Sequence, residues 1–170
     1  LFPDDQLFIM PYNRVVKDLN GLAPKDFLSA VRQAGFTVEY KGREQTAPAR
    51  KGTFGMYLSD GWYLLTAHEK LHSSDPVKGL DVSILQENLL APILGVKDPR
   101  TDKRIDFVGG IRGLGELECR VSKDMAVAFS MYATSIPELL SVADEGLLMP
   151  PKSTWFEPKL RSGLFIHRLS

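Results

Sequence analysis

Two apolar runs on either side of an Asp-Gly pair constrain the fold of this chain most. The stretch FGMYLSDGWYLLTA at residues 54–67 places Asp60 and Gly61 between two runs rich in strand-forming side chains. Asp-Gly is a preferred pair for the two-residue type I′ turn, whose backbone twist matches that of paired antiparallel strands. The sequence therefore predicts a β-hairpin at this position.

Other segments carry helix signals. In APKDFLSAVRQAG, Pro24 suits a first helical turn and Gly35 a C-terminal stop, so a helix is expected over 24–34. Further helices are expected at about 79–91, after residue 113 with Leu114, Leu117 and Val121 on one face, and after the capping-box pair Ser135 and Glu138. Extended segments are expected at 7–10, 12–16, 36–40, 105–108, 125–133 and 164–169.

Because helices and strands interleave, we expect an α/β or α+β fold, with helices packed on a mixed β-sheet that includes the Asp-Gly hairpin. The 170 residues are 44% hydrophobic and 25% charged, which is typical of one soluble globular domain, so residues 1–170 are expected to form a single domain. The chain begins without Met, in strand-like sequence, and we interpret it as the C-terminal fragment of a longer protein.

Charge and cysteine content narrow the class of protein. The 21 basic and 21 acidic residues cancel, whereas a domain that coats nucleic acid is usually basic. The single cysteine, Cys119, excludes an internal disulfide framework and suits a reducing compartment. No apolar run approaches the roughly 20 residues that cross a bilayer, and we expect no membrane association.

The stretch RIDFVGGIRGLGE is the first candidate anion site. A strand enters the glycines and a helix leaves them, so backbone N–H groups and the helix dipole can meet an anion. Gly109 and Gly110 would allow close approach, and Arg112 would pair with a phosphate or carboxylate. Asp106, on the strand that feeds the turn, is the most interesting acid or base. The alternative is a connection whose glycines serve packing only.

Arg14 is the second candidate. In PYNRVVKD, Asn13, Val15 and Lys17 share one strand face, while Arg14 and Val16 share the other. If both valines are buried, the sheet is covered on both sides, and a buried guanidinium then needs a partner. That partner is either a structural carboxylate or the phosphate or carboxylate of a ligand.

The third candidate is MPPKSTWFEPKLRSG at residues 149–163. Its prolines bar a regular helix, yet Trp155 is bracketed by Lys152, Lys159 and Arg161. Three interpretations stay open: a loop that plugs a core, the wall of a small-anion site, or a single-stranded nucleic acid surface. No metal site is predicted, because the HEKLH match at 68–72 is followed by a turn signal that leaves little room for a zinc-binding helix.

Three longer motifs carry a family resemblance: MPYNRVVKDLNGL, DKRIDFVGGIRGLGEL and MPPKSTWFEPKLRSGLFIH. Together they resemble the C-terminal part of a bacterial family of unknown function, whose members are labelled ParB/RepB-like. Full-length members carry an upstream Asp-Gly-His-His-Arg motif similar to that of ParB-like folds, which include free-serine kinases. That motif is absent here, so the catalytic residues are unknown. The resemblance implies a cytoplasmic bacterial protein that binds a nucleotide or phosphorylated metabolite.

The leading hypothesis is the C-terminal domain of a ParB-like nucleotide- or phosphometabolite-binding enzyme, with phosphoryl transfer like that of a free-serine kinase. The expected cofactor is ATP or ADP with Mg in the full-length protein, and the expected partners are a small anion and an upstream domain of the same protein. One alternative is a DNA-associated partition or regulatory protein. Another is a non-catalytic dimerisation domain, in which the Trp155 loop anchors a homodimer.

Overall fold

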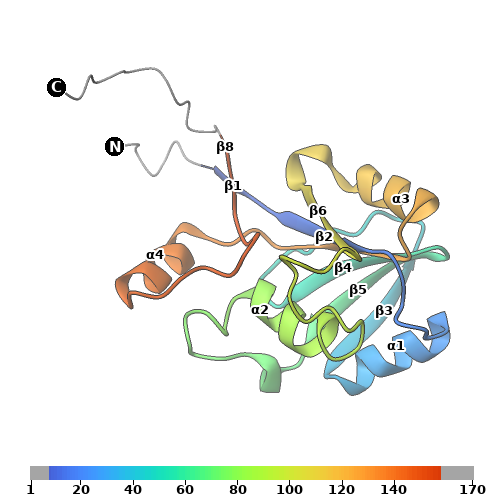
Figure 1. Ribbon diagram of the computed structural model, residues 1–170, viewed down its shortest axis with the longest axis horizontal. Helices are drawn as coiled ribbons and strands as arrows, with labels where there is room; N and C mark the ends of the chain where they lie inside the picture. The colour runs from blue at the N-terminus through green and yellow to red at the C-terminus, as the bar shows by residue number, and fades with distance from the viewer. Residues whose placement is uncertain (1–7, 158–170) are drawn as a thin grey trace.

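The computed structural model describes residues 8–157 and shows an α+β fold (Figure 1). Its main sheet has six strands in the order β3-β5-β4-β7-β2-β6. The strands, in chain order, are β2 (Tyr12–Val16), β3 (Phe36–Gly42), β4 (Thr53–Leu58), β5 (Gly61–Ala67), β6 (Ile105–Gly109) and β7 (Val127–Ser130). The predicted fold class, with helices packed on a sheet, is confirmed.

Every described pairing in the sheet is antiparallel. The mixed sheet that the sequence predicted is therefore not found; the sheet is antiparallel. Strand β7 lies between β4 and β2, with Met56 and Arg14 both opposite Phe129. A parallel pair needs a crossover that returns the chain to the same edge. Here strands that run in the same direction and follow one another in the chain, such as β3 and β4 or β6 and β7, are separated in the described sheet by at least one antiparallel strand.

The predicted hairpin is formed by β4 and β5, but its turn lies one residue earlier than expected. Leu58 pairs with Gly61, so Ser59 and Asp60 are the two loop residues. Neither has a positive φ, which excludes the type I′ geometry. Gly61 is needed for a different reason: its φ is 142°, and a Cβ there would lie 2.3 Å from the carbonyl oxygen of Gly42.

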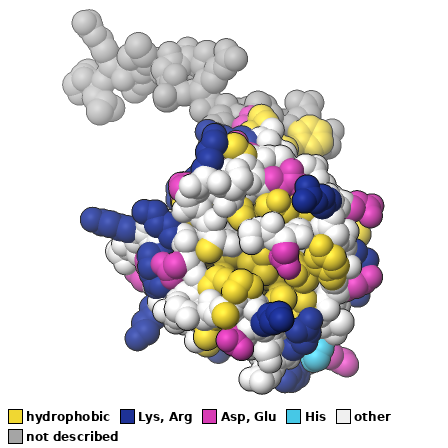
Figure 2. All heavy atoms as spheres, turned by 90° about the vertical axis from the view of Figure 1, so that its right-hand side faces the viewer, with side chains coloured by type: hydrophobic (Ala, Val, Ile, Leu, Met, Phe, Trp, Pro, Cys, Tyr) yellow, Lys and Arg dark blue, Asp and Glu magenta, His cyan; other side chains and the backbone are white. Residues whose placement is uncertain are grey.

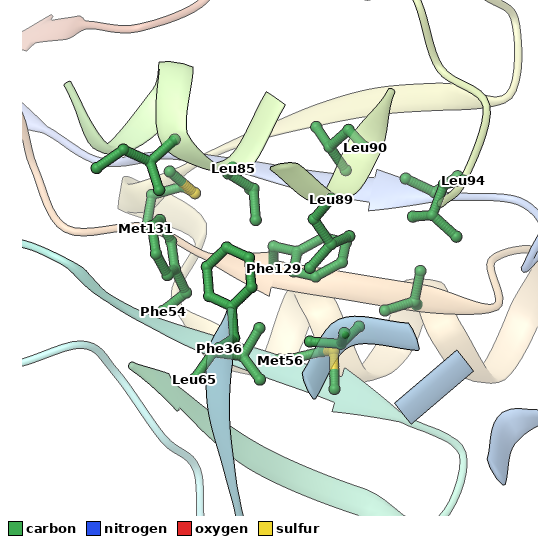
Figure 3. Close-up of a cluster of buried hydrophobic side chains, with 14 of the residues drawn as sticks. Phe36, Phe54, Met56, Leu65, Leu85, Leu89, Leu90, Leu94, Phe129 and Met131 are labelled. Atoms are coloured by element: carbon green, nitrogen blue, oxygen red, sulfur yellow. The ribbon is translucent and has the colours of Figure 1, made fainter. Parts of the chain in front are cut away.

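Both faces of the sheet are covered. Helix α1 (Pro24–Gln33) and the consecutive helices α2 (Asp81–Leu85) and η3 (Gln86–Leu90) bury their apolar side chains in one large core (Figures 1 and 3). Helix α3 (Leu114–Lys123) covers the opposite face, where Leu117 packs with Val15 and Trp62. Val15 and Val16 are therefore fully buried in different cores, as the strand alternation predicts.

The helices at 24–34 and after residue 113 are confirmed, and the one expected at 79–91 is formed by α2 and η3. The predicted capping box opens α4 (Ile136–Asp144): Ser135 Oγ accepts from the backbone N–H of Glu138, and Glu138 Oε2 accepts from that of Ser135. Within residues 8–157, no helix has both the length and the apolar character of a membrane span.

A two-stranded sheet extends from the main body. Pro11 separates β2 from β1 (Phe8–Met10), and β1 pairs with β8 (Trp155–Glu157). Figure 1 shows this ribbon leading away from the start of β2. The strand expected at 164–169 lies outside the described residues. The small sheet brings the segment after α4, with its prolines and Lys152, against the start of β2.

Candidate ligand-binding site

A cavity of about 250 Å³ lies where η3, β6 and the segment after α4 meet. We call it the inner chamber. Its lining is mainly apolar, and Arg14 and Glu87 are its charged members. The complete lining is Arg14, Val77, Val82, Ser83, Gln86, Glu87, Leu90, Pro99, Ile105, Phe107, Leu148, Pro150 and Pro151.

A second depression of about 380 Å³ opens beside the chamber, and we call it the outer groove. The two spaces share four lining residues: Pro99, Ile105, Phe107 and Pro151. The rest of the groove is aromatic or charged, with Tyr12, Arg100, Asp102, Asp106 and Lys152. Because they share these four residues, the chamber and the groove are adjacent, and together they offer an apolar part and a polar part.

Arg14 reaches this site from the middle of β2. Its side chain is only 4% exposed, and its Nη1 donates to the backbone oxygen of Tyr12. Nη2 donates to the backbone oxygen of Lys152 over 2.9 Å, and the guanidinium lies 5.7 Å from the ring centroid of Phe107. Burial lowers the pKa of Arg14 to about 10, so it stays protonated at neutral pH.

None of the ion pairs among residues 8–157 includes Arg14. Of the two partners that the sequence left open, a structural carboxylate is therefore not found in the described part of the chain. Two backbone carbonyls satisfy hydrogen bonds but leave the positive charge uncompensated. Because a buried charge without an opposite charge is costly, this cation at the wall of a cavity indicates a binding site for an anion.

Lys152 is held on the other side of the shared wall. Its Nζ lies 5.5 Å from the ring centroid of Tyr12, and its backbone has a φ of 56°. The turn is fixed by Ser153, whose hydroxyl donates to the Pro150 oxygen over 2.8 Å and whose carbonyl accepts from Thr134. Lys152 forms no ion pair within residues 8–157, so its charge is available to the outer groove.

The two glycines at the end of β6 have a packing role in the structure. A Cβ on Gly109 would lie 2.8 Å from the ring of Trp155, and one on Gly110 would lie 2.7 Å from Pro11. The ring of Trp155 also meets that of Tyr12 edge to face, at 5.2 Å between centroids. Trp155 thus braces the strand ends that carry the site.

The other candidates from the sequence are placed differently. Asp106 lines the outer groove, where it accepts from Arg120 over 2.9 Å. Burial raises the pKa of Asp106, but the bonds from Arg120 and the Phe107 amide outweigh this, so the pKa lies below its usual value.

Arg112 is exposed, pairs with Glu116 at 3.6 Å and lines neither space. Lys159 and Arg161 lie outside the described residues.

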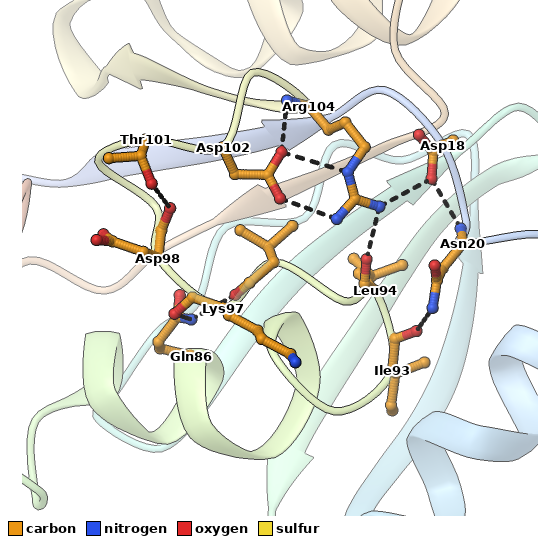
Figure 4. A network of polar contacts seen from close by, with 11 residues as sticks. Asp18, Asn20, Gln86, Ile93, Leu94, Lys97, Asp98, Thr101, Asp102 and Arg104 are labelled. Atoms are coloured by element: carbon orange, nitrogen blue, oxygen red, sulfur yellow. Dashed lines mark hydrogen bonds and ion pairs between the residues drawn. The ribbon is translucent and has the colours of Figure 1, made fainter.

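A polar network holds the loop that forms the outer rim (Figure 4). Arg104 donates from Nη2 to Asp102 over 2.8 Å and from Nη1 to the Leu94 oxygen over 3.0 Å. Gln86 donates to the Val96 oxygen over 2.7 Å. These bonds fix both ends of the charged turn that carries Pro99 and Arg100, so the rim is held in place by structure rather than by a ligand.

Several lining residues carried no signal in the sequence. Gln86, Glu87 and Leu90 face the chamber from η3, which is π-helical. Such segments are rare and occur frequently at functional sites. The sequence predicts a helix there but not that it is π-helical. The HEKLH stretch forms only a short 3₁₀ turn, η2 (Glu69–Leu71).

Figure 2 shows one face of the molecule, on which basic and acidic side chains are interspersed around exposed apolar atoms. On this face there is no continuous basic surface of the kind that the DNA-binding alternative requires.

Residues 1–83 match the model of a family described as protein of unknown function (DUF1015). This supports the resemblance to an uncharacterised family, while the ParB/RepB-like label stays a prediction. No curated protein matches the chain.

Solved structures share the fold. Free serine kinase in complex with AMP matches with a TM-score of 0.52 and 13% identity, over 89% of this chain and 54% of that chain. A free serine kinase mutant in complex with ADP gives 0.50 and 15%, over 89% and 54%. A conserved hypothetical protein from Pyrococcus furiosus gives 0.54 and 12%, over 89% and 56%. This chain therefore spans about half the length of these proteins.

Proposed function

We propose that this chain is part of an enzyme that binds a nucleotide or a phosphorylated metabolite, with the inner chamber and outer groove as its site. One observation carries the proposal: Arg14 is a buried cation without a carboxylate partner among residues 8–157, at the wall of a cavity. Free serine kinase structures with a similar fold are in complex with AMP or ADP, which supports the choice of ligand.

The candidate residues have different roles in this site. Arg14 and Lys152 compensate the negative charge of the ligand, and Asp106 with its partner Arg120 shapes the groove. Gly109, Gly110 and Trp155 hold these groups in position through the contacts described above. Arg112, Lys159 and Arg161 are proposed as further cations for a ligand that extends beyond the groove.

The reaction class in the proposal is phosphoryl transfer by a ParB-like, cytoplasmic enzyme that resembles free-serine kinases. Phosphoryl transfer depends mainly on positioning the substrates and on cations close to the phosphates, which suits a site with two arginine or lysine charges. ATP or ADP with Mg²⁺ is the proposed cofactor of the full-length protein. The upstream part of the protein is proposed to supply the catalytic residues.

Calorimetric titration of the purified chain with AMP, ADP, ATP with Mg²⁺, serine and phosphoserine tests the proposal. A nucleotide or phosphoserine is expected to bind, and Arg14→Met and Lys152→Met are each expected to lower its affinity at least tenfold. Lys25→Met is the matched control, because Lys25 is exposed on α1 and lines neither space. Binding of a DNA duplex alone, weakened steeply by salt, would overturn the proposal in favour of the DNA-associated alternative.

A further inference from the structure

The two parts of the site differ in the chemistry that they offer. Glu87 and Arg14 are the charged side chains of the inner chamber, and most of its other walls are aliphatic or proline. The outer groove is rich in charge instead, but its acids are already paired: Asp102 with Arg104, and Asp106 with Arg120. Lys152 is left as the groove cation without an acidic partner among residues 8–157.

Arg14 and Lys152 each lie over one ring of an aromatic pair. The rings of Tyr12 and Phe107 meet edge to face at 5.7 Å between centroids. Arg14 lies over Phe107 and lines the chamber, while Lys152 lies over Tyr12 and lines the groove. Each space thus has one cation without an acidic partner among residues 8–157, and an anionic group that contacts both must lie where the two spaces meet.

An exposed apolar side chain marks the chamber as the place for an apolar group. Leu148 lines the chamber although 88% of it is exposed. Removing such a side chain from water is favourable, and a bound apolar surface would do so. A phosphate in the same position would lose its hydration against aliphatic walls, which is costly.

We propose that the inner chamber holds the flat ring system of a nucleotide, and that its phosphates point outward past Arg14 to Lys152. This inference rests on the proposed function and deepens it: the site is the nucleotide subsite, not the subsite of a small polar metabolite such as serine or phosphoserine. Ser83, Gln86 and Glu87 supply the polar groups that meet the ring edge.

Ligand fragments combined with variants at the two ends test the orientation. The affinities of AMP, adenosine and ribose 5-phosphate are measured by calorimetry or by NMR titration. Leu148→Ser is expected to weaken AMP and adenosine about three- to tenfold, because it removes apolar contact, and to leave ribose 5-phosphate unchanged. Lys152→Met is expected to weaken AMP and ribose 5-phosphate and to leave adenosine unchanged.

Leu140→Ser is the matched control, since Leu140 is also an exposed leucine, at 54%, but lines neither space. Val77→Trp, which fills the chamber from its partly buried wall, is expected to abolish adenosine binding and to spare ribose 5-phosphate.

The opposite pattern, in which the chamber variants weaken only ribose 5-phosphate, overturns the inference and leaves the proposed function standing. Tight phosphoserine binding that Val77→Trp abolishes, without nucleotide binding, also overturns the inference alone. If no nucleotide or phosphorylated ligand binds the unsubstituted chain, both fail.

Discussion

Arg14 on β2 donates from Nη2 to the backbone oxygen of Lys152 over 2.9 Å, across a sequence separation of 138 residues. With the bond from Nη1 to the Tyr12 oxygen, one guanidinium holds the start of β2 and the turn after α4 together. The same residue is the buried charge of the candidate site. Its role in the fold and its proposed role in binding must therefore be separated by different substitutions.

Arg14→Lys is expected to lower the free energy of unfolding by about 1–3 kcal/mol, because an ammonium keeps the charge but cannot span both carbonyls and leaves a buried acceptor unpaired. Urea unfolding of the variant and of the unsubstituted chain measures this difference. Arg32→Lys, at an exposed position on α1, is the control and is expected to change stability by less than about 0.5 kcal/mol. Equal stability of Arg14→Lys and the unsubstituted chain would show that the two hydrogen bonds do not hold this junction.

The glycines near the site give a second prediction. Gly109→Ala is expected to destabilise by about 1–3 kcal/mol, because its Cβ would lie 2.8 Å from the Trp155 ring and the ring would have to move. Gly115→Ala, in the exposed first turn of α3, meets nothing closer than 3.8 Å and is expected to stabilise by about 0.4–1 kcal/mol. Thermal unfolding of the two variants and of the unsubstituted chain measures the direction of each change in stability. If both variants are stabilised, Trp155 does not pack on Gly109 in solution.

Local signals predicted most of the elements. Pro24 and Gly35 mark the ends of α1 to within two residues, and the Ser135–Glu138 spacing predicts the capping box. These features depend on residues close in sequence, where propensity and capping decide the structure. Such local signals could not predict the position of β7 between β4 and β2, because this position depends on pairing between residues far apart in the chain.

The candidate site was predictable only in part, for the same reason. Alternation along one strand placed Val15 and Val16 on opposite faces, and the condition that both are buried, which the structure meets, led to Arg14 as a buried charge. Glu87 was not predicted as a residue of the site, because the π-helical geometry of η3 gives no simple periodicity in the sequence. Arg112 was predicted from the glycine-rich loop; in the structure it pairs with Glu116 at the surface, and its part in ligand binding stays a proposal.

The capping box of α4 yields a third prediction. Ser135→Ala is expected to cost about 1 kcal/mol, because the backbone N–H of Glu138 loses its acceptor. Ser141→Ala, on the exposed side of the same helix, makes the same chemical change without touching the cap, and it is expected to be neutral or slightly stabilising. Chemical unfolding compares the two. A similar effect of both substitutions would contradict the proposed energetic role of the cap.

Asp81 gives a prediction on pH dependence. It is 8% exposed at the start of α2, and both carboxylate oxygens accept from the backbone N–H of Gly52, over 2.9 and 3.1 Å. Burial raises the pKa of Asp81 to about 6; the bond from Gly52 and the charges of Lys51 and His72 act against this rise, and Glu138 adds to it. In the unfolded chain the same carboxyl has a pKa of about 3.9.

Because the folded pKa is the higher one, Asp81 favours the folded state when it is protonated, and this contribution is lost as the pH rises from about 4 through 6. The full difference is at most about 3 kcal/mol. Asp81→Asn removes the titration, so the stability of the variant relative to the unsubstituted chain is expected to rise between pH 4.5 and 7.5. Urea unfolding at several pH values measures it, with the exposed Asp144→Asn as control. A relative stability that stays constant or falls over this range would mean that the ionised carboxylate, held by Gly52 and Lys51, is the form that the fold prefers.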